Sequence, residues 1–249
     1  MSNDDGYKYV YGVVHASAVP SPRPGIGGSG VELIAFGRIG ATVSALPEGD
    51  IDAGRTALMI HAEVLDDALS GGVVLPMRFG VVMADAEAVR RDLLERYYDA
   101  LLSQLVELEG KVELRVRAVF EEAAVVGEVV HEDAEIARLR DSLQGRDESA
   151  TYYDRIRLGE MVAVAVARKC QAEGQEILRE LAPLALAVDP GEVGHERVAL
   201  NASFLLRSDR VADFDEAVDE IGRKREGRLR LKYTGPLPPY SFAALAVER

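Results

Sequence analysis

The chain has 249 residues, of which 48% are hydrophobic and 29% charged, a composition that excludes disorder as its main state. Acidic residues outnumber basic ones 42 to 29, and the formal charge of −13 argues against nucleic acid and lipid membranes as main partners. The longest apolar runs, at 161–167 and 181–188, are too short to span a membrane, and the acidic start of the chain is not typical of a secretory signal. We therefore expect a cytoplasmic protein of one large or two small domains.

The first half of the chain predicts a sheet with two helices. In chain order the expected elements are strands at 7–14, 31–36 and 38–46, a helix at 53–70, a strand at 73–83 that is either continuous or broken near Pro76 or Gly80, a helix at 85–109 and a strand at 112–120. Asp52 is a good N-cap for the first helix, and Gly110 ends the second. The last strand alternates apolar and charged residues, which points Glu113 towards solvent. This order predicts a ferredoxin-like N-terminal domain over residues 1–120.

The second half predicts a helical hairpin followed by a βαβ unit. Its expected elements are helices at about 121–143 and 153–186, a turn at 189–191, a strand at 197–207, a helix from Ser208 to Gly227, and strands at 228–233 and 241–247. Pro183 should kink or end the long helix. Residues 121–249 are thus expected to form a C-terminal α/β domain, and the whole chain belongs to the α+β class with two domains.

Three motifs suggest chemistry but lack the context that such chemistry needs. Gly25 to Gly30 matches G-x-G-x-x-G, yet a strand rather than a helix is expected after it, so we interpret it as a flexible loop. The His131 to Glu135 segment lacks the second histidine of a zinc helix. Cys170, the single cysteine, occupies a core position of the long helix and is expected to be inert. We predict no catalytic residue, no metal and no cofactor.

A basic cluster near the C-terminus allows two interpretations. It consists of Arg223, Lys224, Arg225, Arg228, Arg230 and Lys232. Three of these cations lie in the last turn of a predicted helix, where they complement the helix dipole, and the others alternate along a strand. The cluster is then either a solvated edge or a docking surface for an acidic partner.

Two segments have unusual chemistry for a generic core. Leu75 to Gly80 places Pro76 and Arg78 in a strand that otherwise reads as buried, so we expect an edge or a bulge there. We expect Arg78 to be structural and to bond carbonyls or a carboxylate such as Glu63. Thr234 to Phe242 contains three prolines in four residues, which favours an extended path. This segment is either a rigid turn, with Pro238 and Tyr240 pinning the tail to the core, or a recognition surface.

Taken together, these segments resemble the gas vesicle protein F/L family nearly from end to end. The resemblance is carried by Tyr7 to Val14, His61 to Leu65, Val74 to Gly80, Leu158 to Glu160, Leu200 to Leu205 and Gly235 to Phe242. The sequences LPMRFG and GPLPPYSF are its specific parts, and the loop at 20–30 is not part of the pattern. F and L members look alike, so the residues do not separate the two types.

The resemblance implies an accessory protein in the formation of gas vesicles, the protein shells that give cells buoyancy. It implies binding to the small hydrophobic shell protein and to other accessory proteins, and it transfers no catalytic residue. The family-motif residues, each with a structural or partner-binding role, are Pro76, Arg78, Phe79, Gly80, Asn201, Phe204, Gly235, Pro236, Pro238, Pro239 and Tyr240. The alternative hypothesis is a small-molecule enzyme or ligand sensor that uses a ferredoxin-like pocket.

Overall fold

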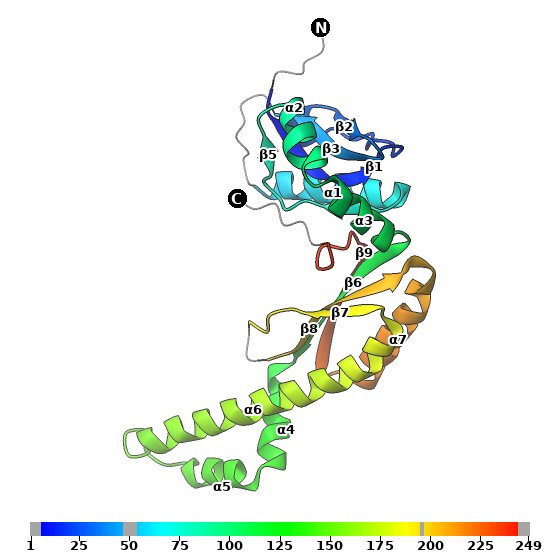
Figure 1. The fold of residues 1–249 in the computed structure, drawn as a ribbon. Helices are drawn as coiled ribbons and strands as arrows, with labels where there is room; N and C mark the ends of the chain where they lie inside the picture. Colours follow the sequence, from blue (N-terminus) through cyan, green and yellow to red (C-terminus); the bar gives the residue numbers. More distant parts are fainter. Residues whose placement is uncertain (1–5, 47–53, 195–196, 244–249) are drawn as a thin grey trace. The chain divides into compact units, whose positions relative to one another are not determined.

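The computed structural model describes residues 6–46, 54–194 and 197–243, and it confirms the α+β class with two antiparallel sheets (Figure 1). The chain divides into two compact units. The first unit consists of the residues up to Glu113 together with those from Pro236 onwards, and the second unit spans Leu114–Gly235. That residues 1–120 and 121–249 fold as independent domains stays a prediction.

The first unit is built on a sheet in the order β2-β3-β1-β4, in which β5 also pairs with β1. Its elements are β1 (Lys8–His15), η1 (Ile26–Gly28), β2 (Val31–Phe36), β3 (Ile39–Ala45), α1 (Arg55–Gly71), β4 (Val74–Pro76), β5 (Val82–Met83), α2 (Ala86–Ala88), η2 (Val89–Glu95) and α3 (Tyr98–Leu108). The predicted strand at 73–83 is thus two short strands, both antiparallel to β1. The first helix begins at Arg55, and the predicted cap Asp52 lies outside the described residues.

The helix predicted over 85–109 is interrupted near its middle. Asp85 caps its start by accepting a bond from the Ala88 amide at 2.7 Å. The stretch Val89–Glu95 is π-helical, and the Arg96 amide bonds the Arg91 carbonyl five residues back. This wider turn ends in the non-helical Tyr97, from which α3 begins. Apolar periodicity locates the buried stripe correctly but does not reveal such a break.

The glycine- and proline-rich loop packs onto the core of the first unit. Ile26 is buried, its amide donates to the Tyr11 hydroxyl at 2.7 Å, and its carbonyl accepts from Ser44 at 3.1 Å. Arg23 bonds Asp67 of α1 at 2.8 Å. The G-x-G-x-x-G motif is therefore part of the loop between β1 and β2, and it does not lead into an α-helix.

The second unit is built on a sheet in the order β7-β8-β6-β9. Its elements are β6 (Lys111–Phe120), α4 (Glu122–Glu132), α5 (Ala134–Leu143), α6 (Tyr152–Leu181), η3 (Ala182–Leu184), β7 (Ala187–Pro190), β8 (Val198–Arg207), η4 (Ser208–Arg210), α7 (Val211–Lys224) and β9 (Leu229–Leu237). The strand predicted at 112–120 was assigned to the first sheet, which is wrong, because β6 lies between β8 and β9. The βαβ unit formed by β8, α7 and β9 is therefore split by a third strand.

Local hydrogen bonds explain where this unit departs from the prediction. The Asp133 side chain accepts from the amides of Glu135 and Ile136, so it ends α4 and starts α5 within one predicted helix. The turn predicted at 189–191 is wrong, because Asp189 and Pro190 belong to β7 and pair with Ser203 and Ala202 of β8. The last predicted strand, 241–247, is a turn up to residue 243 and otherwise lies outside the described residues.

Helix α6 crosses the sheet of the second unit at very close range (Figure 1). A Cβ atom placed on Gly174 would lie 1.9 Å from the Ala199 carbonyl oxygen of β8, so only glycine permits this approach. The surrounding core joins Cys170 and Ile177 of α6 to Phe204 of β8 and Phe214 of α7. In the described part of the chain, no helix is both long and apolar enough to cross a membrane.

Candidate functional site

The first family motif forms the link between β4 and β5. Pro76 is buried and pairs with Gly12 of β1. Phe79 is half-buried and lies with its ring centre 6.1 Å from that of Tyr9 and 5.7 Å from that of His61. Gly80 has a φ of 93°, which favours glycine, and its amide donates to the Tyr9 hydroxyl at 3.1 Å. The motif is thus bonded to a buried tyrosine of the opening strand.

Tyr9 and His61 form a buried polar pair under this motif. The Tyr9 hydroxyl and His61 Nδ1 are 2.8 Å apart, and the two side chains are almost fully buried. Burial lowers the pKa of His61 to about 4, because the charged imidazolium is poorly solvated there. Burial also raises the pKa of Tyr9. Both groups are therefore neutral at pH 7.

Arg78 differs from the prediction that it anchors the strand. Its side chain is exposed, and it makes no hydrogen bond or ion pair with any residue that the structure describes. The expected partner Glu63 lies 3.5 Å from Arg23 instead. The structure therefore does not place Arg78 in the predicted anchoring contacts, and within the described ranges its exposed side chain has no bonded partner.

The second family motif fastens the C-terminal segment to the first unit. Pro238 and Pro239 are buried. The Ser241 amide and hydroxyl donate to the carboxylate of Glu113 at 2.7 and 3.1 Å. Glu113 is fully buried, so the prediction that it faces solvent is wrong: the segment covers it. Gly235 and Pro236, which precede this contact, are exposed.

The two motifs meet at Tyr9. Tyr240 lies close enough to contribute to the raised pKa of Tyr9, and Phe79 packs against the same ring. Tyr240 remains 38% exposed, and Arg78 is exposed beside Phe79. Segments more than 150 residues apart thus both approach Tyr9.

The remaining family-motif residues lie in the second unit and have structural contacts. Phe204 is buried in the core with its ring centre 5.1 Å from that of Phe214. Asn201 is half-buried, and its side-chain amide donates to the Glu192 carbonyl at 2.9 Å, which fixes the loop after β7.

Most of the basic cluster is neutralised by carboxylates of this chain. Arg225 is buried and bonds Glu173 at 2.6 Å and Glu180 at 3.0 Å. Arg228 makes two bonds to Glu128, at 2.6 and 2.9 Å, and reaches Glu173 at 3.4 Å. Hydrogen bonds from Arg228 are the main cause that lowers the pKa of Glu128 to about 2. These two arginines join α4, α6 and the start of β9, so they are structural.

The other four cations of the cluster are exposed. Lys224 pairs with Glu220 at 2.9 Å, and Arg230 pairs with Glu121 at 2.7 Å. Arg223 reaches the Asp219 carbonyl, at 3.4 Å. Lys232 has no hydrogen bond or ion pair within the described ranges. Two of the six cations are thus used internally, and a docking surface formed by the four exposed ones stays a prediction.

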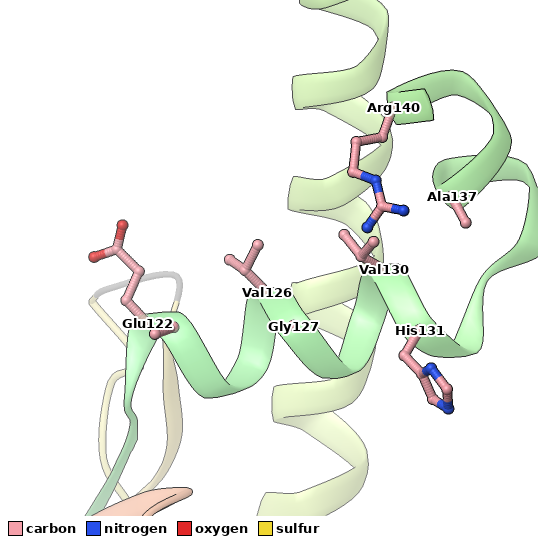
Figure 2. Close-up of a pocket in the computed structure, with 8 residues that line it drawn as sticks. Glu122, Val126, Gly127, Val130, His131, Ala137 and Arg140 are labelled. Carbon is pink, nitrogen blue, oxygen red and sulfur yellow. The ribbon is translucent and has the colours of Figure 1, made fainter. Parts of the chain in front are cut away.

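A wide apolar groove of about 910 Å³ lies between α4 and α5 in the second unit (Figure 2). Its residues are Glu122, Ala123, Val126, Gly127, Val130, His131, Ala137 and Arg140. Val126 is 37% exposed, and the charged Glu122 and Arg140 lie towards opposite ends. The sequence analysis missed this groove, because the helix break at Asp133 that creates it was not predicted.

Two parts of the sequence bear on cysteine and metal chemistry, namely Cys170 and the His131 to Glu135 segment. Cys170 is buried as predicted, and burial raises the pKa of its thiol, which disfavours the reactive thiolate. Asp133 lies in the segment that was compared with a zinc helix, and its side chain caps the start of α5. Across residues 6–46, 54–194 and 197–243, no cluster of three or more potential metal ligands occurs.

Comparison with known proteins now decides the family. The family model "Gas vesicle synthesis protein GvpL/GvpF" matches residues 7–244. The chain belongs to the GvpL/GvpF family. This confirms the resemblance drawn from the LPMRFG and GPLPPYSF segments and gives the chain a role connected with gas vesicles.

GvpL/GvpF relatives match this chain over most of their length. Gas vesicle protein F of Streptomyces sp. (strain CB03234) is 37% identical over 238 residues, which are 94% of this chain and 98% of that protein. Gas vesicle protein L of the same strain is 30% identical, over 98% of this chain and 95% of that protein. The chain is thus related to both types.

Crystal structures of GvpF show the same fold. GvpF from Anabaena sp. PCC7120 aligns with a TM-score of 0.83 at 24% identity, over 97% of this chain and 99% of that one. GvpF from Microcystis aeruginosa aligns with a TM-score of 0.78 at 23% identity, over 96% and 99%. The arrangement of elements is therefore shared with the family across large sequence distances.

Proposed function

We propose that this chain is a non-enzymatic accessory protein that acts in the cytoplasm to assemble gas vesicles. In this role it binds the small hydrophobic shell protein and other accessory proteins. Membership of the GvpL/GvpF family is the observation that carries the proposal. It favours an accessory role over the alternative of a small-molecule enzyme, because the family is named for gas vesicle synthesis.

The α4–α5 groove is our candidate for the shell-protein contact. An apolar subunit is prone to aggregate before it assembles, so a partner must cover part of its surface. The groove offers alanine and valine side chains and the bare backbone of Gly127 over two helices, with Val126 partly exposed (Figure 2). Amphipathic helices commonly bind in grooves of this kind by placing apolar residues against the floor.

The surface where the two family motifs meet is our candidate for a second partner contact. Arg78 is exposed and has no hydrogen bond or ion pair among the described residues, and Phe79 and Tyr240 both lie near Tyr9 with exposed area. Arginine and tyrosine are enriched among residues that dominate binding energy at protein interfaces. This surface is therefore suited to an accessory protein.

The direct experiment measures vesicle yield from a complete vesicle gene cluster with and without this chain, by flotation and electron microscopy. We expect vesicles to be lost without it. Unchanged yield, in cells that also lack any paralogue, would contradict the proposal.

A matched pair of variants tests the groove. Val126→Glu places a charge on its floor, whereas Val164→Glu places the same charge on an exposed valine of α6 that does not line the groove. We expect only the first to reduce co-purification with the shell protein, by about tenfold or more. Equal loss in both, or no loss in either, would exclude the groove as the contact.

A further inference from the structure

A small basic pocket lies in the second unit, beside the strands β6 and β9. It has a volume of about 280 Å³ and is lined by Arg117, Val119, Phe120, Arg197, Arg230 and Lys232. Four of these six residues are cations and none is acidic, although the chain as a whole carries a charge of −13. Cations that lie close together repel one another unless an anion binds between them.

The charges around the pocket are only partly balanced from within. Arg230 pairs with Glu121 at 2.7 Å, and Arg197 lies 3.7 Å from Glu122 and bonds the Phe120 carbonyl at 3.4 Å. Arg117 and Lys232 are exposed and form no hydrogen bond or ion pair with the part of the chain that the structure describes. Two cations thus remain available to an external anion.

The spacing of the cations matches an extended peptide. Arg115 and Arg117 are two residues apart on β6, and Arg230 and Lys232 are two residues apart on the neighbouring strand β9. Residues two apart on a strand lie roughly 7 Å from each other on one face. Arg230 and Lys232 thus form a short row with the period of alternate side chains in a strand, and Arg117 lies on the neighbouring strand. Arg115 continues the row of Arg117 outside the pocket and bonds the Ser203 hydroxyl at 3.3 Å.

From this arrangement we infer that the basic pocket binds an acidic, extended peptide segment of a partner protein, with carboxylates at alternate positions. This inference deepens the proposed function, on which it rests for the kind of partner. It differs from the basic cluster singled out in the sequence, because Arg225 and Arg228 are used internally, and the pocket adds Arg117 of β6 and Arg197, which directly precedes β8.

The test uses the full chain and two synthetic peptides, one of alternating glutamate and threonine and one of alternating glutamine and threonine. Binding is measured by titration calorimetry for the wild type, for Arg117→Gln/Lys232→Gln, and for the control Arg168→Gln/Arg223→Gln. The control removes two exposed cations that do not line the pocket, so the net charge changes equally. Thermal melting checks that all three proteins are folded.

We expect the acidic peptide to bind the wild type and the control, and to lose about tenfold in affinity on the pocket variant. Binding should also weaken as salt is raised from about 0.05 to about 0.3 M, since exposed charges are screened. No binding of the acidic peptide to the wild type, equal loss in the two variants, or equal binding of the neutral peptide would each overturn the inference. The vesicle-yield experiment is independent of these results, so failure of the proposed function can be distinguished from failure of this site.

Discussion

The two units hold their functional segments in place by different means. In the first unit, Tyr9, His61 and Gly80 are joined by neutral hydrogen bonds beneath a cluster of aromatic rings. In the second unit, Arg225 and Arg228 join helices and strand through ion pairs with glutamates. Buried neutral groups thus fix a loop to a strand and a helix in the first unit, whereas paired charges join long helices to a sheet in the second.

The physical consequence is a different response to the loss of one partner. A neutral hydrogen bond contributes roughly 1 kcal/mol net, whereas a buried charge without its partner costs several times more. The first unit should therefore respond most to pH, through its histidine, and the second most to substitutions that leave a carboxylate unpaired.

The largest expected effect is that of Arg225→Ala in the second unit. It leaves Glu173, which is 8% exposed, without its 2.6 Å partner, and we expect a loss of roughly 3–5 kcal/mol in unfolding free energy. Chemical denaturation followed by circular dichroism measures it. Arg230→Ala, which removes an exposed arginine from a pair, should cost about 1 kcal/mol or less. Similar losses in both variants would contradict the structural role given to Arg225.

The next effect is the pH dependence that His61 gives to the first unit. Because its pKa falls from 6.5 to about 4 on folding, the unfolded chain binds more protons between these values. Stability should therefore decrease by roughly 3 kcal/mol as the pH is lowered from about 6.5 to about 4.

Denaturation midpoints across this pH range measure the effect. His61→Phe should remove this part of the pH dependence, whatever its effect at pH 7. His131→Gln, at an exposed histidine, should retain it. A wild-type midpoint that stays constant over the range would show that His61 is not held neutral by burial.

A smaller effect is expected where the C-terminal segment is fastened. Glu113→Ala removes the acceptor of two hydrogen bonds from Ser241, and we expect a loss of roughly 2–3 kcal/mol. Ser241→Ala removes only the hydroxyl donor, so about 1 kcal/mol should be lost. Hydrogen exchange of the amides of residues 240–243 measures the release directly. Unchanged protection in Glu113→Ala would refute the fastening, as would a chain truncated at Thr234 that stays fully stable.

The smallest effect on stability is expected for Arg78→Ala. Since this side chain is exposed and unbonded, the unfolding free energy should change by less than about 0.5 kcal/mol. Co-purification with accessory proteins should decrease if the motif surface is a contact. A clear drop in melting temperature would restore the structural role expected from the sequence.

Much of the fold followed from local pattern. Apolar periodicity located α6 and α7, and the strong alternation of residues 112–120 located β6. The breaks at Asp133 and Tyr97 were missed, because a cap or a π-turn changes hydrogen bonds without changing the apolar stripe. The candidate grooves were missed for the same reason, since they depend on where helices break and which strands are neighbours.

The sequence by itself determined the family, through LPMRFG and GPLPPYSF, and the α+β class, through the order of periodic segments. It did not determine that β6 pairs with β8 and β9, that Arg225 meets Glu173, or that Arg78 is exposed while Glu113 is buried. These are contacts between residues distant in the chain, with Arg225 and Glu173 separated by 52 positions. Local propensity depends on nearby neighbours, so only the packing of the whole chain decides which side chain a distant carboxylate will meet.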